Sequence, residues 1–175
     1  APDHVMGSTT TGGETTPGAV KVGKGGEYAN LDAVVMDAVN ELIDVVYQDD
    51  DDLVVICGRE LLSDKYFPLV NKEQENSEKL AADMIISQKR MGGLQAVRAP
   101  FFPPNALLIT RLDNLSIYWQ EDTRRRSVID NPKRDRIENF ESVNEAYVVE
   151  DYRCAALVEN IQIGDFSAAA AETGA

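Results

Sequence analysis

The sequence predicts an α+β protein of two parts, a lobe of helices and strands over residues 17–120 and a lobe of antiparallel strands over residues 124–166. Two observations predict this fold class. A helical pattern of apolar residues from Leu31 is followed, after an acidic turn, by the β-branched run LVVIC. From Arg124 onward the chain is densely charged and yet alternates like long β-strands. A chain of 175 residues can bury one core of ordinary size.

Residues 1–26 are expected to be a flexible linker. Residues 7–26 are rich in Gly and Thr and nearly free of large apolar side chains, so little burial offsets the entropy lost on ordering them. Residues 18–25 nearly spell the phosphate-binding loop G-x-x-x-x-G-K-[ST]. Gly25 stands where that loop needs Ser or Thr for magnesium, and no strand precedes it, so a surface loop is favoured over a nucleotide site.

The clearest helix follows Asn30, which is suited to cap it, and has Asp32 in its first turn. The acidic residues 49–52 end this helix and lead into a buried strand at residues 53–57, which Gly58 terminates. The acidic run lacks the Gly and the distal Glu of an EF-hand loop, so a solvated turn is favoured over a calcium site. The apolar residues that share one face of the helix are Leu31, Val34, Val35, Ala38, Val39, Leu42, Ile43 and Val46.

Two further helices and several strands complete the predicted elements. One helix runs from Arg59 toward Pro68, and another follows a capping Ser77 until Gly92 and Gly93 break the chain. The second of these takes in Leu80, Ala81, Met84 and Ile85. Strands are expected at residues 94–99, 106–111, 115–120, 128–137 and 146–163, with turns at Asn131-Pro132 and residues 142–144. Residues 167–175 are expected to be a disordered tail.

Six cations stand between Arg124 and Arg136, interleaved with Asp130 and Asp135. Carboxylates follow from Glu138 onward, so one extended element changes sign along its length and is suited to pair with copies of itself. A solvated strand face with ion pairs inside the chain is the alternative. The candidate subunit-interface residues are Arg124, Arg125, Arg126, Lys133, Arg134, Arg136 and Glu138.

Together with LLITRLDNLSIYWQ just before it, this stretch resembles the C-terminal part of the major capsid protein of P2-like tailed bacteriophages. Further similar blocks are EYANLDAVVMDAVNELI, DLVVICGRELLSDKYFPLVNKEQENSEKLAADMIISQKR and GGLQAVRAPFFP, so the resemblance covers residues 27–166. It implies the HK97-like capsid fold, with an A-domain at residues 17–120 and P-domain strands at residues 124–166. Because the chain begins at Ala1 and shows nothing like the family's N-terminal arm, hairpin loop or spine helix, we expect it to be the C-terminal half of a longer subunit.

The resemblance implies a structural virion protein and not an enzyme. Such subunits assemble into hexamers and pentamers of an icosahedral, DNA-containing head, in the cytoplasm of the bacterial host. The implied partners are other copies of the subunit and the scaffolding and portal proteins, and no catalytic residue, cofactor or metal ligand is carried over. The alternatives are an acidic α/β nucleotide-binding or enzymatic domain and a small binding module that acts alone. In dilute solution the chain is expected to be mainly monomeric.

The composition of the chain makes several functions and cellular locations less expected. A net charge of −13 repels nucleic acid phosphates, so specific nucleic acid binding is not expected. No stretch approaches the ~18 apolar residues of a membrane span, and no signal peptide is seen, so a soluble cytoplasmic product is expected. Cys57 and Cys154 are expected to be buried, reduced thiols, and the single histidine, His4, lies in a segment expected to fray. The aromatics Tyr118, Trp119, Phe140, Tyr147 and Tyr152 are interpreted as strand core in preference to a single-strand nucleic acid platform.

Overall fold

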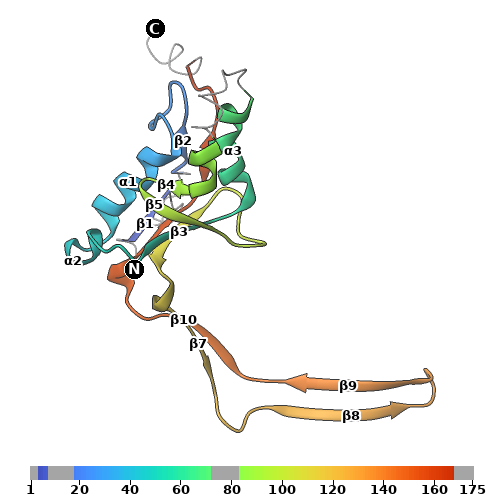
Figure 1. The fold of residues 1–175 in the computed structure, drawn as a ribbon. Coiled ribbons are helices and arrows are strands. Elements are labelled where there is room, and N and C mark those ends of the chain that lie inside the picture. Colours follow the sequence, from blue (N-terminus) through green and yellow to red (C-terminus); the bar gives the residue numbers. More distant parts are fainter. Residues whose placement is uncertain (1–3, 8–17, 72–82, 168–175) are drawn as a thin grey trace. The chain divides into compact units, whose positions relative to one another are not determined.

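The computed structural model describes residues 4–7, 18–71 and 83–167, without the side chains of residues 68–70. The chain divides into two compact units (Figure 1). We call residues 1–112 with 151–175 the sheet unit, and residues 113–150 the hairpin unit. Helices and strands are mixed in the first unit and the second is built on strands, which confirms the predicted α+β class.

A mixed six-stranded sheet forms the centre of the sheet unit. The predicted strand β3 (Leu53–Cys57) is confirmed, and all five of its residues are buried. It pairs in parallel with β5 (Leu94–Arg98) and antiparallel with β6 (Leu107–Arg111). Beyond β6 lie β11 (Ala155–Val158) and β1 (Val5–Met6), and beyond β5 lies β4 (Arg90–Met91).

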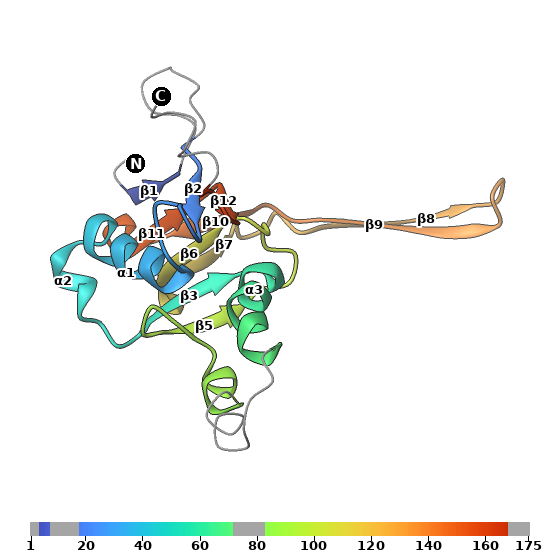
Figure 2. The ribbon, with the colours of Figure 1, turned by 90° about the horizontal axis from the view of Figure 1, so that it is seen from above.

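Helix α1 (Leu31–Leu42) is the predicted helix, and the Asn30 side chain caps it by accepting from the Ala33 amide at 2.9 Å. It buries Leu31, Val34, Val35 and Ala38 and contacts β1, β4 and β11, so it crosses the sheet (Figure 2). The helix ends four residues earlier than expected. Ile43 is extended, and Asp44 caps a separate helix, α2 (Val45–Gln48), by accepting from the Val46 amide at 3.1 Å.

The remaining helices agree with the prediction where they are described. Helix α3 (Arg59–Val70) starts directly after Gly58 and continues two residues past Pro68. Residues 83–88 are helical, whereas the expected cap Ser77 and the expected face residues Leu80 and Ala81 lie outside the described residues. Among the described residues, no helix is both long enough and apolar enough to cross a membrane.

The expectation of a flexible segment before residue 27 is wrong where the structure describes it. Val20–Val22 forms strand β2, which pairs in parallel with β12 (Ile161–Ile163). Val20 and Val22 alternate onto one face and are each only 3% exposed, so two side chains suffice to anchor a segment of low apolar content. His4 is also held, because its ring Nδ1 lies 2.7 Å from the carbonyl oxygen of Leu42. Residues 8–17 and 168–175 lie outside the described residues.

Two consecutive antiparallel ladders make up most of the hairpin unit. The first pairs β7 (Leu115–Trp119) with β10 (Glu145–Val149), and the second pairs β8 (Arg125–Asn131) with β9 (Arg136–Ser142). The predicted turn after Asn131 joins β8 to β9. The short 3₁₀ helices η2 (Leu112–Asn114) and η3 (Tyr152–Cys154) flank this excursion. An extended hairpin was not expected from the sequence.

The two units divide the chain differently from the predicted lobes at residues 17–120 and 124–166. Residues 113–120 belong to the hairpin unit, and residues from 151 onward return to the sheet unit. They return because the apolar run of β11 pairs antiparallel with β6 and buries Ala156 and Val158 completely. That the sheet unit corresponds to the A-domain and the hairpin unit to the P-domain remains a prediction.

Candidate functional site

The seven predicted interface residues lie on β8, β9 and their flanks. Arg124 directly precedes β8, Lys133 and Arg134 lie in the turn, and Arg136 and Glu138 are on β9. Residues that pair directly across the ladder share a face of the hairpin. One face therefore carries Arg125, Ser127, Ile129, Asn131, Arg136, Glu138, Phe140 and Ser142. The other face carries Arg126, Val128, Asp130, Ile137, Asn139 and Glu141.

Ion pairs inside the chain use only part of this cationic set. Arg124 pairs with Glu141 at 2.5 Å, and Arg136 pairs with Glu138 at 2.8 Å. Such exposed pairs contribute only ~0–1 kcal/mol each. Arg126 donates to Asn139 Oδ1 at 3.3 Å, whereas Arg125, Lys133 and Arg134 have neither an ion pair nor a side-chain hydrogen bond with any residue that the structure describes. Three cations of the hairpin are therefore available to a partner.

Large apolar side chains are uncovered on both faces of β8 and β9. Ile129 and Phe140 lie on the first face, 49% and 55% exposed. Val128 and Ile137 lie on the second, 60% and 73% exposed. Every residue of the two strands except Asn131 and Glu138 is exposed. An isolated two-stranded hairpin is marginally stable in water, so a hairpin with no covered face is suited to bind a partner.

The interpretation of the aromatics as strand core is wrong. Tyr118, Trp119, Phe140, Tyr147 and Tyr152 are all more than half exposed. The predicted alternation of side chains along the strands is present, because Ile117, Trp119 and Tyr147 lie on one face of the β7–β10 ladder. This ladder has only two strands and neither face is buried, so alternation cannot by itself create a core. In β8 and β9, charged residues stand on both faces of the ladder, and this pattern in the sequence was the signal that neither face would be buried.

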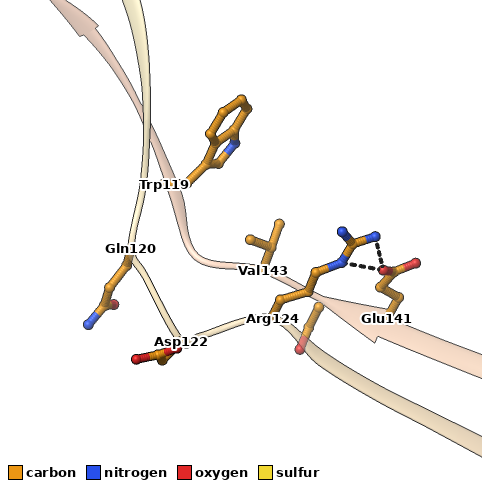
Figure 3. A pocket seen from close by; sticks show the side chains of 7 residues that line it. Trp119, Gln120, Asp122, Arg124, Glu141 and Val143 are labelled. Atoms are coloured by element: carbon orange, nitrogen blue, oxygen red, sulfur yellow. Dashed lines mark hydrogen bonds and ion pairs between the residues drawn. The ribbon is translucent and has the colours of Figure 1, made fainter.

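A pocket of about 470 Å³ lies where the two ladders meet (Figure 3). Five residues, 120–124, separate β7 from β8, whereas only residues 143–144 separate β9 from β10. Asn144 holds the longer segment, because its side-chain amide donates to Gln120 Oε1 at 3.1 Å and its carbonyl accepts from the Gln120 amide at 3.1 Å. The lining includes Trp119, Val143 and the paired Arg124 and Glu141, so the pocket suits an apolar side chain with a polar neighbour.

The resolved pKa shifts of the hairpin unit favour a structural role. A hydrogen bond from Tyr118 to Glu150, 2.7 Å long, is the main cause that raises the pKa of Tyr118 and lowers that of Glu150. A hydrogen bond of 2.7 Å to Glu145 likewise raises the pKa of Tyr147. These shifts move each group away from neutral pH, which is the opposite of what acid–base catalysis requires.

The other sequence candidates have structural places in the sheet unit. Asp50, from the acidic run, pairs with Arg111 at 2.9 Å. Within the described part of the chain, no group of three or more His, Cys, Asp or Glu residues is arranged to hold a metal ion. Cys57 and Cys154 are buried free thiols, and burial raises the pKa of both, which makes them poor nucleophiles.

Comparisons with known proteins agree with this architecture. Residues 1–161 match the family model described as phage major capsid protein, P2 family. The chain is 62% identical to a relative of Escherichia phage P2 named capsid proteins, over the whole chain and 50% of the relative. It is 40% identical to the major capsid protein of Serratia phage KSP20, over 78% of the chain and 40% of the relative. A chain in the solved procapsid of satellite phage P4 with its size determination protein matches with a TM-score of 0.83 and 57% identity, over 95% of this chain and 49% of that one.

The fold is that of a chain from a phage procapsid, and the two curated relatives are named as capsid proteins. This chain belongs to the P2 family of phage major capsid proteins. The predicted resemblance and the HK97-like fold class are confirmed, and the alternative of a nucleotide-binding or enzymatic domain is not supported. The chain spans about half the length, 50% and 40%, of the curated relatives that it matches.

Proposed function

We propose that this chain is part of a major capsid subunit of a tailed phage, and that its β8–β9 hairpin binds neighbouring copies of the subunit in the shell. The observation that carries the proposal is a seven-residue ladder with apolar side chains exposed on both faces. Exposed apolar side chains are unfavourable in water, so the free energy falls when another protein covers them.

Charge favours another copy of the subunit as that protein. Residues 124–136 contain six of the 17 cations against Asp130 and Asp135, which leaves 11 cations against 28 of the 30 acids in the rest of the chain. The hairpin of one copy is therefore attracted to the acidic surface of the next. Arg125, Lys133 and Arg134 are the best candidates for these contacts. Arg124, Arg136 and Glu138 already have ion-pair partners in the chain, and Arg126 donates a hydrogen bond to Asn139. Individual exposed pairs are weak, so their main effect is on the register of the contact.

Family membership supports a wider role that belongs to the same proposal. Copies of the subunit would form hexamers and pentamers and close into an icosahedral head around DNA, with assembly in the host cytoplasm and with scaffolding and portal proteins as partners. Many modest contacts suffice in such a shell, because avidity grows with the number of subunits engaged. The A-domain and P-domain assignments of the two units belong to the same proposal.

Paired serine substitutions on one hairpin face test this function in the full-length subunit. We expect Val128→Ser with Ile137→Ser to abolish shells and larger oligomers in negative-stain images and sedimentation. Both side chains are already more than half exposed, so the circular dichroism spectrum should not change. The matched control is Met36→Ser on α1, 57% exposed and outside the hairpin, which should still assemble. Shells of normal yield from the double variant would refute the proposal.

A further inference from the structure

A groove in the sheet unit combines two arginines with exposed aromatic side chains. Arg98 ends β5 and pairs with Cys57 at the end of the parallel strand β3, and Arg59 opens α3 two residues later. Two hollows of about 410 and 290 Å³ both have these arginines in their lining. Neither arginine makes an ion pair with a residue that the structure describes. We call this surface, with Phe67 and Phe101, the basic groove.

The aromatic side chains of the basic groove point to a protein partner. Phe101 is 105% exposed, and its φ of +62° lies in the left-handed region, which is unfavourable for a bulky side chain. Phe67, from α3, is 62% exposed. Because the Phe101 side chain is fully exposed, this backbone conformation adds no burial that would stabilise the isolated chain. Covering Phe101 and Phe67 would bury apolar area beside two available cations.

The opposite end of β3 carries a surface of complementary character. Val45 and Val46 of α2 are each 78% exposed, and Asp49, Asp51 and Asp52 are exposed beside them. These three aspartates make no ion pair within the described part of the chain. We call this surface the acidic corner. Figures 1 and 2 both show α2 and α3 at opposite ends of β3.

The acidic corner is held in a fixed conformation. The Gln48 side chain donates to the Ile43 carbonyl at 2.8 Å, and Tyr47 donates to Asp151 at 3.0 Å. The Asp44 amide donates to the Arg153 carbonyl at 3.1 Å, which ties the start of α2 to a distant part of the sheet unit. A surface that is already ordered loses little conformational entropy on binding, so α2 is suited to act as the inserted element.

We propose that the basic groove of one copy receives the acidic corner of a second copy. Val45 and Val46 would cover the exposed phenylalanines while the aspartates pair with Arg59 and Arg98. Because the two surfaces differ and lie at opposite ends of one strand, the contact is head-to-tail and leaves each copy with a free groove and a free corner. Such contacts repeat and close into a ring when the rotation allows. This inference rests on the proposed function, and it adds a contact that does not involve the hairpin.

Disulfide trapping in the full-length subunit tests the contact. Val46→Cys with Phe67→Cys should give a ladder of linked multimers under mild oxidation, which a reductant dissolves. Cys57 and Cys154 are buried and should stay silent. The matched control, Met36→Cys with Phe67→Cys, uses another exposed residue of the sheet unit and should give no ladder. Absence of the ladder in a subunit that still assembles would overturn this inference alone, whereas a subunit that never self-associates would overturn the proposed function as well.

Charge exchange provides a second, independent measurement. Arg59→Glu with Arg98→Glu makes both surfaces acidic, and Asp49→Lys with Asp51→Lys makes the corner basic. Each variant alone is expected to self-associate at least about tenfold more weakly, because every head-to-tail contact opposes like charges. An equimolar mixture should recover association, since the two variants complement each other in alternation. Unchanged association of the single variants, or no recovery on mixing, would count against the contact.

Discussion

Gly92 offers a sharp test of how the sheet unit holds its helices in place. It lies in the turn between β4 and β5, and its amide donates to Asp32 Oδ1 at 2.6 Å. Asp32 belongs to the first turn of α1 and also pairs with Lys65 of α3 at 2.6 Å. Lys65 and Tyr66 both donate to the Arg90 carbonyl. This one turn therefore connects α1 and α3 to the edge of the sheet.

Replacing Gly92 with alanine should be far more costly than replacing its neighbour Gly93. Both residues have positive φ, +59° and +85°, so a side chain at either costs ~1–2 kcal/mol in backbone strain. A Cβ at Gly92 would also lie 2.5 Å from Cγ1 and 2.7 Å from Cβ of the fully buried Val35, whereas a Cβ at Gly93 meets nothing within 4 Å. Overpacking of this kind adds ~1–3 kcal/mol. The free energy of unfolding should fall by ~2–5 kcal/mol for Gly92→Ala and by ~1–2 kcal/mol for Gly93→Ala.

Urea unfolding followed by circular dichroism measures both variants against the parent chain. The difference between them isolates the contact with Val35, because strain is common to both. The melting temperature of Gly92→Ala should therefore lie ~2–12 °C below that of Gly93→Ala, at about 2–4 °C per kcal/mol for a chain of this size. Equal destabilisation of the two variants would refute the reasoning, since it would mean that α1 moves away from the added methyl group at no cost.

Three further predictions concern caps and titrating groups. Asn30→Ala removes the cap of α1 and should lower the free energy of unfolding by ~0.5–2 kcal/mol, as judged by urea unfolding. Burial and the hydrogen bond to Asp37 raise the pKa of Tyr28 above its ordinary 10.0, so stability should decline as pH rises above that value, and Tyr28→Phe should decline less in melts between about pH 9 and 11. Hydrogen bonds from Arg153 lower the pKa of Asp151 from 3.8 to about 2, so its stabilisation is present above pH 3.8 and lost toward pH 2. Asp151→Asn should flatten that acid dependence, and an unchanged acid melt would contradict the assignment.

Under the two proposals, the hairpin and the sheet unit provide different kinds of contact between copies of the subunit. The hairpin exposes apolar residues on both faces, and three of its cations have neither an ion pair nor a side-chain hydrogen bond in the described chain. The sheet unit carries two unlike surfaces at the ends of one strand. If both proposals hold, hairpin variants and groove variants should affect association independently, because the two sets of residues belong to different compact units.

Elements set by local rules were predictable from the sequence. The Asn30 cap, the buried run of β3 and the turn after Asn131 all lie where propensity and periodicity placed them. The end of α1 was missed because Ile43 and Val46 continue its apolar pattern, whereas Asp44 starts a new helix by capping α2. The cationic stretch was recognised as a candidate interface, whereas nothing in the run PFFPP predicts the positive φ of Phe101.

By itself, the amino-acid sequence determined the family, the α+β class and the identity of most helices and strands, because each depends on residue order along a short segment. Only the tertiary structure decided which elements share a core. In that structure, the pairing of β11 with β6 places residues 151–167 in the sheet unit, and Val20 and Val22 are buried on one face of β2. The alternating aromatics of the hairpin remain exposed to solvent. The physical reason is that burial depends on whether a second layer covers a strand, and that layer comes from residues far away in the chain.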